Sequence, residues 1–120
     1  PGELLDKLTI LQIKSERVQD PAKLRNVRYE LAALDASAAT IPPSDELAAL
    51  ISDLKQVNEA IWEAEDFLRA REKARQFDTQ FIEKARSVYR NNDRRAAVKR
   101  RVNELLAAEF VEEKQHPAYE

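Results

Sequence analysis

Residues 86–101, RSVYRNNDRRAAVKRR, carry seven Arg or Lys residues and a single acid, Asp93. Guanidinium groups recognise phosphates and carboxylates through paired hydrogen bonds, so a dense run of arginines is a candidate anion-binding site. A charged run is also typical of the solvated side of a helix. The direction in which each basic side chain points decides between these two interpretations.

A helical wheel separates these basic residues. Arg95 falls between the directions of Val102 and Leu106, inside an apolar stripe, and Arg94 and Lys99 lie at the two edges of that stripe. An arginine that points inward must find a carboxylate or an anionic ligand, because an unpaired buried charge is very costly. Arg95 is therefore the residue of greatest interest in the run.

Two partners for Arg95 are possible. The acids available on the preceding helix are Glu59, Glu65 and Asp66. Alternatively, a phosphate, nucleotide or nucleotide sugar binds at the start of a helix over 94–106, where free backbone N–H groups attract anions. The residues assigned to this second site are Arg95, Arg94, Tyr89, Asn92, Arg86 and Lys99. Arg86 lies at a boundary where it can also pair with Glu83.

The single tryptophan, Trp62, is a second candidate. Asn58, Glu65 and Arg69 flank it at helical spacing and form a mixed polar and aromatic stripe. Such a tryptophan packs against a neighbouring helix, or it forms a pocket wall or an interface anchor, where tryptophan is enriched. Trp62 and Glu65 are therefore added to the candidate ligand-binding residues.

Catalytic and metal sites find little support. The pairs Glu63/Asp66 and Glu109/Glu112 have a spacing that can hold Mg²⁺, but the helical pattern turns the first pair outward, as in a solvated acidic surface. His116 stands alone near the C-terminus, and the chain has no cysteine and no phosphate-binding loop. We predict no catalytic residue, no metal and no cofactor.

Composition predicts an all-α protein of one domain, residues 1–120. The 120 residues include one glycine, and 35% are charged. No run approaches the roughly 20 apolar residues of a membrane span, and the lack of cysteine fits a reducing compartment, so we expect a cytoplasmic protein. Residues 84–101 hold eight basic residues and one acid, a net charge of +7, whereas the whole chain carries −2. This balance argues against a general nucleic-acid binder.

Apolar periodicity predicts a bundle of about five helices, 2–18, 21–36, 45–75, 77–89 and 94–106, with the long central helix 45–75 paired in an antiparallel hairpin with helix 21–36. Asp20 and Ser44 are expected to cap helices, and residues 90–93 to interrupt or kink one. The first helix has two apolar surfaces and is either sandwiched within the fold or used in a dimer. The end of the long helix needs cover from the C-terminal helices or from a second chain. Residues 113–120 are expected to form a tail.

Three segments, PGELLDKLTILQIKSERVQDPAKLRNV, NEAIWEAEDFLR and ARSVYRNNDRRAAVKRRVNEL, resemble a family of short bacterial proteins of unknown function. The resemblance implies a cytoplasmic, all-helical, stand-alone protein and supplies no catalytic residue. Our first hypothesis is a non-enzymatic binding or accessory module, a homodimer with Ile10, Ile13 or Trp62 buried between chains. The alternatives are an anionic small-molecule binder centred on Arg95 and a weak nucleic-acid binder.

Overall fold

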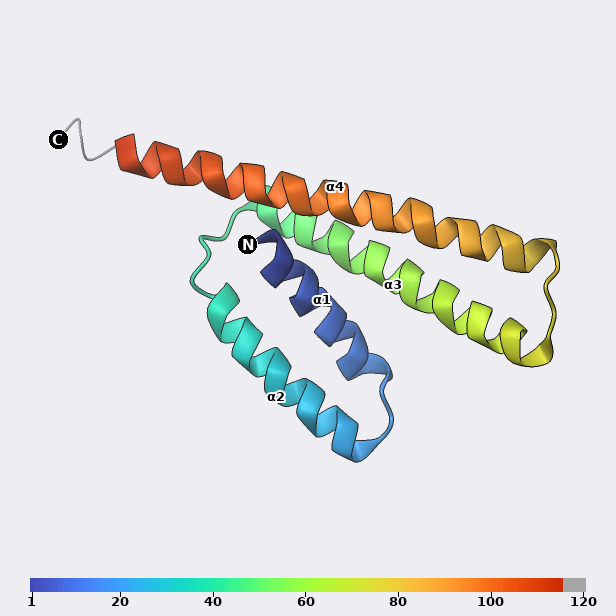
Figure 1. Ribbon diagram of the computed structural model, residues 1–120. Coiled ribbons are helices and arrows are strands. Elements are labelled where there is room, and N and C mark those ends of the chain that lie inside the picture. Colours follow the sequence, from blue (N-terminus) through green and yellow to red (C-terminus); the bar gives the residue numbers. More distant parts are fainter. Residues whose placement is uncertain (116–120) are drawn as a thin grey trace.

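The computed structural model describes the backbone of residues 1–115 and the side chains of residues 1–111. Over this range the chain forms four helices and no strand, which confirms the all-α prediction (Figure 1). The helices are α1 (Gly2–Arg17), α2 (Pro21–Ala38), α3 (Asp45–Ala74) and α4 (Thr79–Gln115).

The prediction of about five helices is wrong by one, because α4 runs without interruption through residues 90–93. Asn91 turns its side chain back along the helix, where Nδ2 donates to the carbonyl of Ser87 at 2.9 Å. Asn92 and Asp93 are exposed, so they do not compete for the backbone hydrogen bonds of the helix. Of the expected tail, residues 113–115 belong to α4 and residues 116–120 lie outside the described residues.

The predicted helix starts are confirmed. Asp20 accepts a hydrogen bond from the backbone of Ala22 at 3.1 Å, with Pro21 as the first residue of α2. Ser44 accepts one from the backbone of Leu47 at 3.1 Å and begins α3. These bonds satisfy backbone donors that a helix leaves free at its first turn.

The predicted hairpin between the second and third helices is wrong. The antiparallel pairs are α1 with α2 and α3 with α4, and α1 also packs against α3 and α4 (Figure 1). The apolar side of α2 is only half-buried, at Leu24, Val27, Leu31 and Leu34. Because α4 is long enough to pair with α3 along its length, α4 and α1 together cover the apolar side of α3, which includes Leu47, Leu50 and Leu54. The first helix is therefore sandwiched within the fold.

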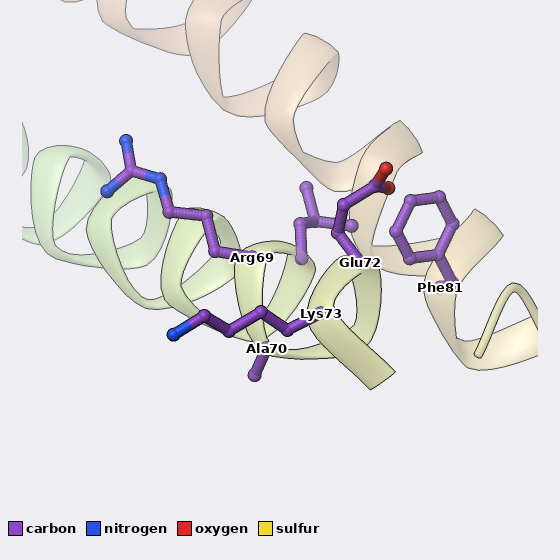
Figure 2. Close-up of a pocket in the computed structure, with 6 residues that line it drawn as sticks. Arg69, Ala70, Glu72, Lys73 and Phe81 are labelled. Atoms are coloured by element: carbon purple, nitrogen blue, oxygen red, sulfur yellow. The ribbon is translucent and has the colours of Figure 1, made fainter. Parts of the chain in front are cut away.

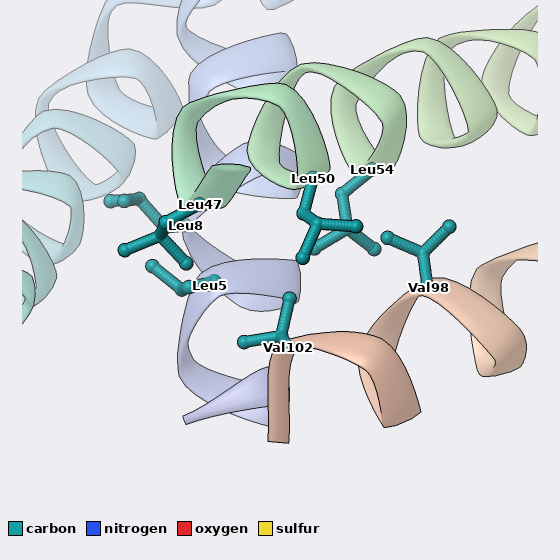
Figure 3. Close-up of a cluster of buried hydrophobic side chains, with 7 residues drawn as sticks. All are labelled: Leu5, Leu8, Leu47, Leu50, Leu54, Val98 and Val102. Atoms are coloured by element: carbon teal, nitrogen blue, oxygen red, sulfur yellow. The ribbon is translucent and has the colours of Figure 1, made fainter. Parts of the chain in front are cut away.

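The apolar core lies where α1 meets the first half of α3 and the second half of α4 (Figure 3). Its buried side chains are Leu5, Leu8, Leu47, Leu50, Leu54, Val98 and Val102. The only glycine of the chain, Gly2, lets α1 approach α4 at this end. A Cβ at Gly2 would lie 2.7 Å from the carbonyl oxygen of Lys99.

Beyond α1 the α3/α4 hairpin continues alone, as a two-helix arm that we define as residues 64–91 (Figure 1). α4 cannot be covered along its length by α1, because 37 residues span about 55 Å and 16 residues about 24 Å. At the tip, Arg71 holds the connection by donating to Gln76, Asp78 and Gln80 at 3.1, 3.0 and 2.7 Å. The C-terminal end of α3 is therefore covered on one side by α4, and cover from the C-terminal part of the chain was one of the two arrangements expected.

Candidate functional site: the Trp62 groove and its polar floor

Arg95 points inward, as its place on the helical wheel predicts, and its partner is Asp6 of α1. Arg95 Nε donates to both carboxylate oxygens of Asp6, at 2.9 and 3.0 Å, and Nη2 donates to Oδ2 at 2.5 Å. The prediction that Glu59, Glu65 or Asp66 would pair with Arg95 is therefore wrong. The pairing acid comes from the first helix because α1, and not α2, packs over this part of α4.

Asp6 belongs to a buried polar network with Thr9 and Asn58. Asp6 is only 2% exposed, and Asn58 Nδ2 of α3 donates to its Oδ1 at 2.9 Å and to Thr9 Oγ1 at 2.9 Å. Thr9 in turn donates to the backbone carbonyl of Asp6 at 2.8 Å. Every fully buried side-chain nitrogen and oxygen of the described residues has a hydrogen-bond partner. The network therefore joins α1, α3 and α4 with well-defined partners.

Lys99 lies on the outer side of this network. Its Nζ pairs with Glu3 of α1 and lies 3.9 Å from Asp6 Oδ2. At the other end of α1, Arg17 pairs with Glu63 at 3.1 Å and Lys55 with Glu16 at 2.7 Å. These two surface pairs link α1 to α3 and contribute little stability.

The charges of the network hold Asp6 ionised. Burial raises the pKa of Asp6, but hydrogen bonds from Arg95 and Asn58, and the positive charges of Arg95 and Lys99, outweigh burial and lower it below its ordinary value of 3.8. The hydrogen bonds to Asp6 raise the pKa of Arg95 against the opposing effect of its burial. Both groups are therefore charged at neutral pH and neutralise one another.

A groove of about 400 Å³ lies beside this network, between α1, α3 and α4. We call it the Trp62 groove. Its lining residues are Ile10, Ile13 and Lys14 of α1, Asn58, Ile61, Trp62, Glu65, Asp66 and Arg69 of α3, and Arg95 of α4. Three isoleucines and an indole make its walls mainly apolar. Its volume falls within the range of small-molecule pockets, about 300–1,000 Å³.

Two polar atoms at the floor of the Trp62 groove have no hydrogen-bond partner among the described residues. Asn58 uses both hydrogens of its amide nitrogen in the network, so its Oδ1 is left over. Arg95 uses Nε and Nη2, so its Nη1 is left over. Both side chains bind the same oxygen, Asp6 Oδ1, and both line the groove. The acceptor and the donor therefore belong to two side chains that are anchored on the same carboxylate oxygen.

Family comparison agrees with the resemblance. A family model described as a family of unknown function, DUF6165, matches residues 1–118. The chain belongs to DUF6165. Comparison with curated proteins and with solved structures gives no match. In this DUF6165 protein the site must therefore be interpreted from its own residues.

The structure brings together only some of the predicted site residues. Arg95, Trp62 and Glu65 line the same groove, and Lys99 joins the adjoining network. Arg94, Asn92 and Tyr89 are exposed on α4 and line no part of the groove. Arg86 is also exposed and lies 4.0 Å from Glu83, as expected. Ile13 is buried within the chain, at 2% exposure, so it is not available for a contact between chains.

Sequence reasoning missed Asp6 and Thr9 and treated Asn58 only as a neighbour of Trp62. A signal was present, because Asp6 and Thr9 share a helical stripe with Ile10 and Ile13, the second apolar surface of the first helix. Asn58 similarly lies one helical turn after Leu54, on the apolar side of its helix. A polar residue inside an apolar stripe indicates a buried hydrogen-bonded group.

Most of the other candidate residues are exposed or lie outside the described residues. Glu63 and Asp66 are exposed, as the helical pattern predicts, and the side chains of Glu112 and His116 lie outside the described residues. Within the described part of the chain, no three His, Cys, Asp or Glu side chains are close enough to hold a metal ion together. No helix there has the length and hydrophobicity needed to cross a bilayer.

Proposed function

We propose that this protein is a non-enzymatic binding module whose binding site is the Trp62 groove. The observation that carries the proposal is the groove itself, which combines mainly apolar walls with a fixed acceptor, Asn58 Oδ1, and a fixed donor, Arg95 Nη1. Binding sites typically place a few oriented polar groups in an apolar concavity of this size. Because these two atoms belong to a buried network, they need no rearrangement to meet a ligand.

The chemistry of the floor supports binding rather than catalysis. A general acid or base works best when its pKa lies near the working pH. Here the pKa of Asp6 is lowered and that of Arg95 is raised, so both are displaced away from neutrality. The ion pair positions the helices and the groove, and does not exchange protons with a substrate.

Two other hypotheses have weaker support. An anionic ligand at Arg95 would have to compete with Asp6, which already takes two of the three guanidinium nitrogens. Weak nucleic-acid binding would depend on Arg86, Arg90 and Arg94, which are exposed along α4 beside one exposed tyrosine, Tyr89, in a chain whose net charge is −2. Arg94, Tyr89 and Asn92 therefore have no part in the binding site that we propose.

A titration with quinoline, an uncharged planar probe at pH 7.5, tests the proposal. Binding in the groove should change the emission of Trp62, the only tryptophan, with a saturable dependence on probe concentration. Ile10→Lys should abolish the change, because it places a charge in the groove wall. Tyr29→Lys is the control, since Tyr29 is exposed on α2 and does not line the groove. Absence of saturable binding, or equal loss in both variants, contradicts a binding site in the groove.

A second candidate function, self-association, is supported by the exposed surface of the chain. The chain exposes 8550 Å², whereas a compact monomer of 13.8 kDa exposes about 6,600 Å². Each partner of a standard interface contributes about 800 Å².

The arm is the surface that a second copy would cover. Near its tip an open concavity of about 800 Å³ is lined by Leu68, Arg69, Ala70, Glu72, Lys73 and Phe81 (Figure 2). Phe77 and Ile82, both about half-exposed, extend the apolar area beside it. Arms packed together would give both hairpins the third and fourth helices that they lack, as in a four-helix bundle.

Sedimentation equilibrium tests the dimer directly. We expect twice the mass of 13.8 kDa at micromolar concentration, and the monomer mass for Phe81→Asp combined with Ile82→Asp. Tyr29→Asp, which changes an exposed aromatic residue of α2, is the control and should remain dimeric. A monomer at all concentrations up to about 0.5 mM refutes self-association and leaves the groove proposal untouched.

A further inference from the structure

We infer that the Trp62 groove takes a small, uncharged, planar ligand with an amide-type edge, in which an N–H stands beside a C=O as in a lactam ring. This inference rests on the proposed function and adds the chemical class of the ligand. It follows from three features of the groove: an oriented acceptor, an oriented donor, and walls and rim whose charges cancel.

The acceptor is Asn58 Oδ1. The orientation of this amide is fixed, because Asp6 and Thr9 receive its two N–H bonds at 2.9 Å each. A flipped amide would turn its oxygen toward the Asp6 carboxylate, which is already an acceptor. Asn58 is only 6% exposed, yet it lines the groove and its oxygen has no partner among the described residues. Because every fully buried side-chain oxygen of the described residues has a partner, this unpaired oxygen must open to the groove, where a ligand can donate to it.

The donor is Arg95 Nη1. Nε and Nη2 are both held by Asp6, so the guanidinium plane is fixed and Nη1 extends from it. Because Asn58 and Arg95 both bind Asp6 Oδ1, the acceptor and the donor lie at the same end of the groove. A ligand edge with one N–H and one C=O satisfies both atoms together, whereas a hydrocarbon or a carboxylate satisfies at most one.

The charges around the groove favour an uncharged ligand. Lys14, Arg69 and Arg95 contribute three positive charges, and Glu65, Asp66 and the adjoining Asp6 contribute three negative charges. A bound anion would also place its oxygens against Asn58 Oδ1. The half-buried Trp62 ring, together with Ile10 and Ile61, offers a flat apolar surface on which a planar ring can stack.

Four matched probes test this class: quinolin-2(1H)-one, its N-methyl derivative, quinoline and quinoline-2-carboxylate. We expect quinolin-2(1H)-one to bind about tenfold more tightly than each of the others, since only it both donates to Asn58 and accepts from Arg95. The N-methyl derivative keeps the ring and the carbonyl and loses only the donor. Dissociation constants come from titrations followed by the chemical shift of the Trp62 indole N–H.

Arg95→Lys gives an independent check, because the single ammonium nitrogen of lysine can pair with Asp6 but provides no second nitrogen at the position of Nη1. In this variant the advantage of quinolin-2(1H)-one over quinoline should disappear, while Arg94→Lys, an exposed neighbour, should keep it. Equal affinity for quinolin-2(1H)-one and its N-methyl derivative overturns the inference, and so does tighter binding of the carboxylate. If quinoline binds without any gain from the lactam edge, only the ligand class fails. If no probe binds, the groove proposal fails as well.

Discussion

Replacing Arg95 by alanine removes the ion pair at the centre of the buried network and should cost about 2–3 kcal/mol of unfolding free energy. Asp6 is 2% exposed and would lose all three hydrogen bonds from the guanidinium group. Removing one partner of a fully buried pair costs about 3–5 kcal/mol. The cost is lower here because the Arg95 side chain is 31% exposed, Asn58 still donates to Asp6, and Lys99 lies 3.9 Å away.

Urea unfolding followed by helical circular dichroism at pH 7 measures this cost. The free energy of unfolding of the whole domain is expected to be about 5–15 kcal/mol, so the variant should still fold and the midpoint should shift clearly. Arg94→Ala is the matched control and should change stability by less than about 0.5 kcal/mol, since Arg94 is exposed. An Arg95→Ala effect as small as that of the control would refute the reasoning.

A double-mutant cycle with Asp6→Ala separates the pair from its surroundings. If the two side chains act together, the double variant should be more stable than the sum of the two single costs predicts, by about 1–3 kcal/mol. Additivity within about 0.5 kcal/mol would mean that each residue acts alone, which the three hydrogen bonds between them do not allow.

Three further predictions concern other parts of the fold. The pKa of Asp6 is lower in the folded state than its ordinary value of 3.8. Ionised Asp6 therefore contributes its full stability above about pH 3.8, and this contribution is lost as the pH falls through the folded-state pKa. The urea midpoint of the wild type should therefore approach that of Asp6→Asn at low pH, and a constant difference would contradict this. Gly2→Ala should destabilise by about 1–3 kcal/mol in the same urea assay, because its Cβ would lie 2.7 Å from the backbone oxygen of Lys99; an unchanged midpoint would show that α1 can shift freely. Arg75→Gly should stabilise the fold by about 0.5–1 kcal/mol and so raise the melting temperature, because Arg75 ends α3 at a φ of 54°, which glycine adopts more easily. A lower melting temperature would show that the Arg75 side chain matters more than its backbone conformation.

The sequence predicted the elements of this fold better than their pairing. The stripes of Leu47, Leu50 and Leu54 and the capping residues Asp20 and Ser44 are local signals, and α2 and α3 begin where they place them. Residues 90–93 misled the prediction because turn-forming residues can also be tolerated on the exposed side of a helix. Which helices pair depends on their final lengths, so joining two predicted helices into α4 changed the partner of α3.

The candidate site was predictable only in part. An inward arginine can be read from a helical wheel, and Arg95 is inward and paired. Its partner could not be read in the same way, since Asp6 lies 89 positions away and is brought near only by the packing of α1 on α4. The free oxygen of Asn58 is less accessible still to sequence reasoning, because it is defined by which hydrogen bonds the amide nitrogen already makes.

The most direct test of the Trp62 groove is a titration of ¹⁵N-labelled protein with quinolin-2(1H)-one. The only tryptophan gives a single indole N–H signal, and Arg95 can be followed by its side-chain Nε–H. We expect both signals to shift together and to saturate, while the backbone signals of the exposed residues Arg94 and Tyr89 stay in place. Shifts confined to the tip of the arm, or no saturable shift at Trp62, would contradict the account.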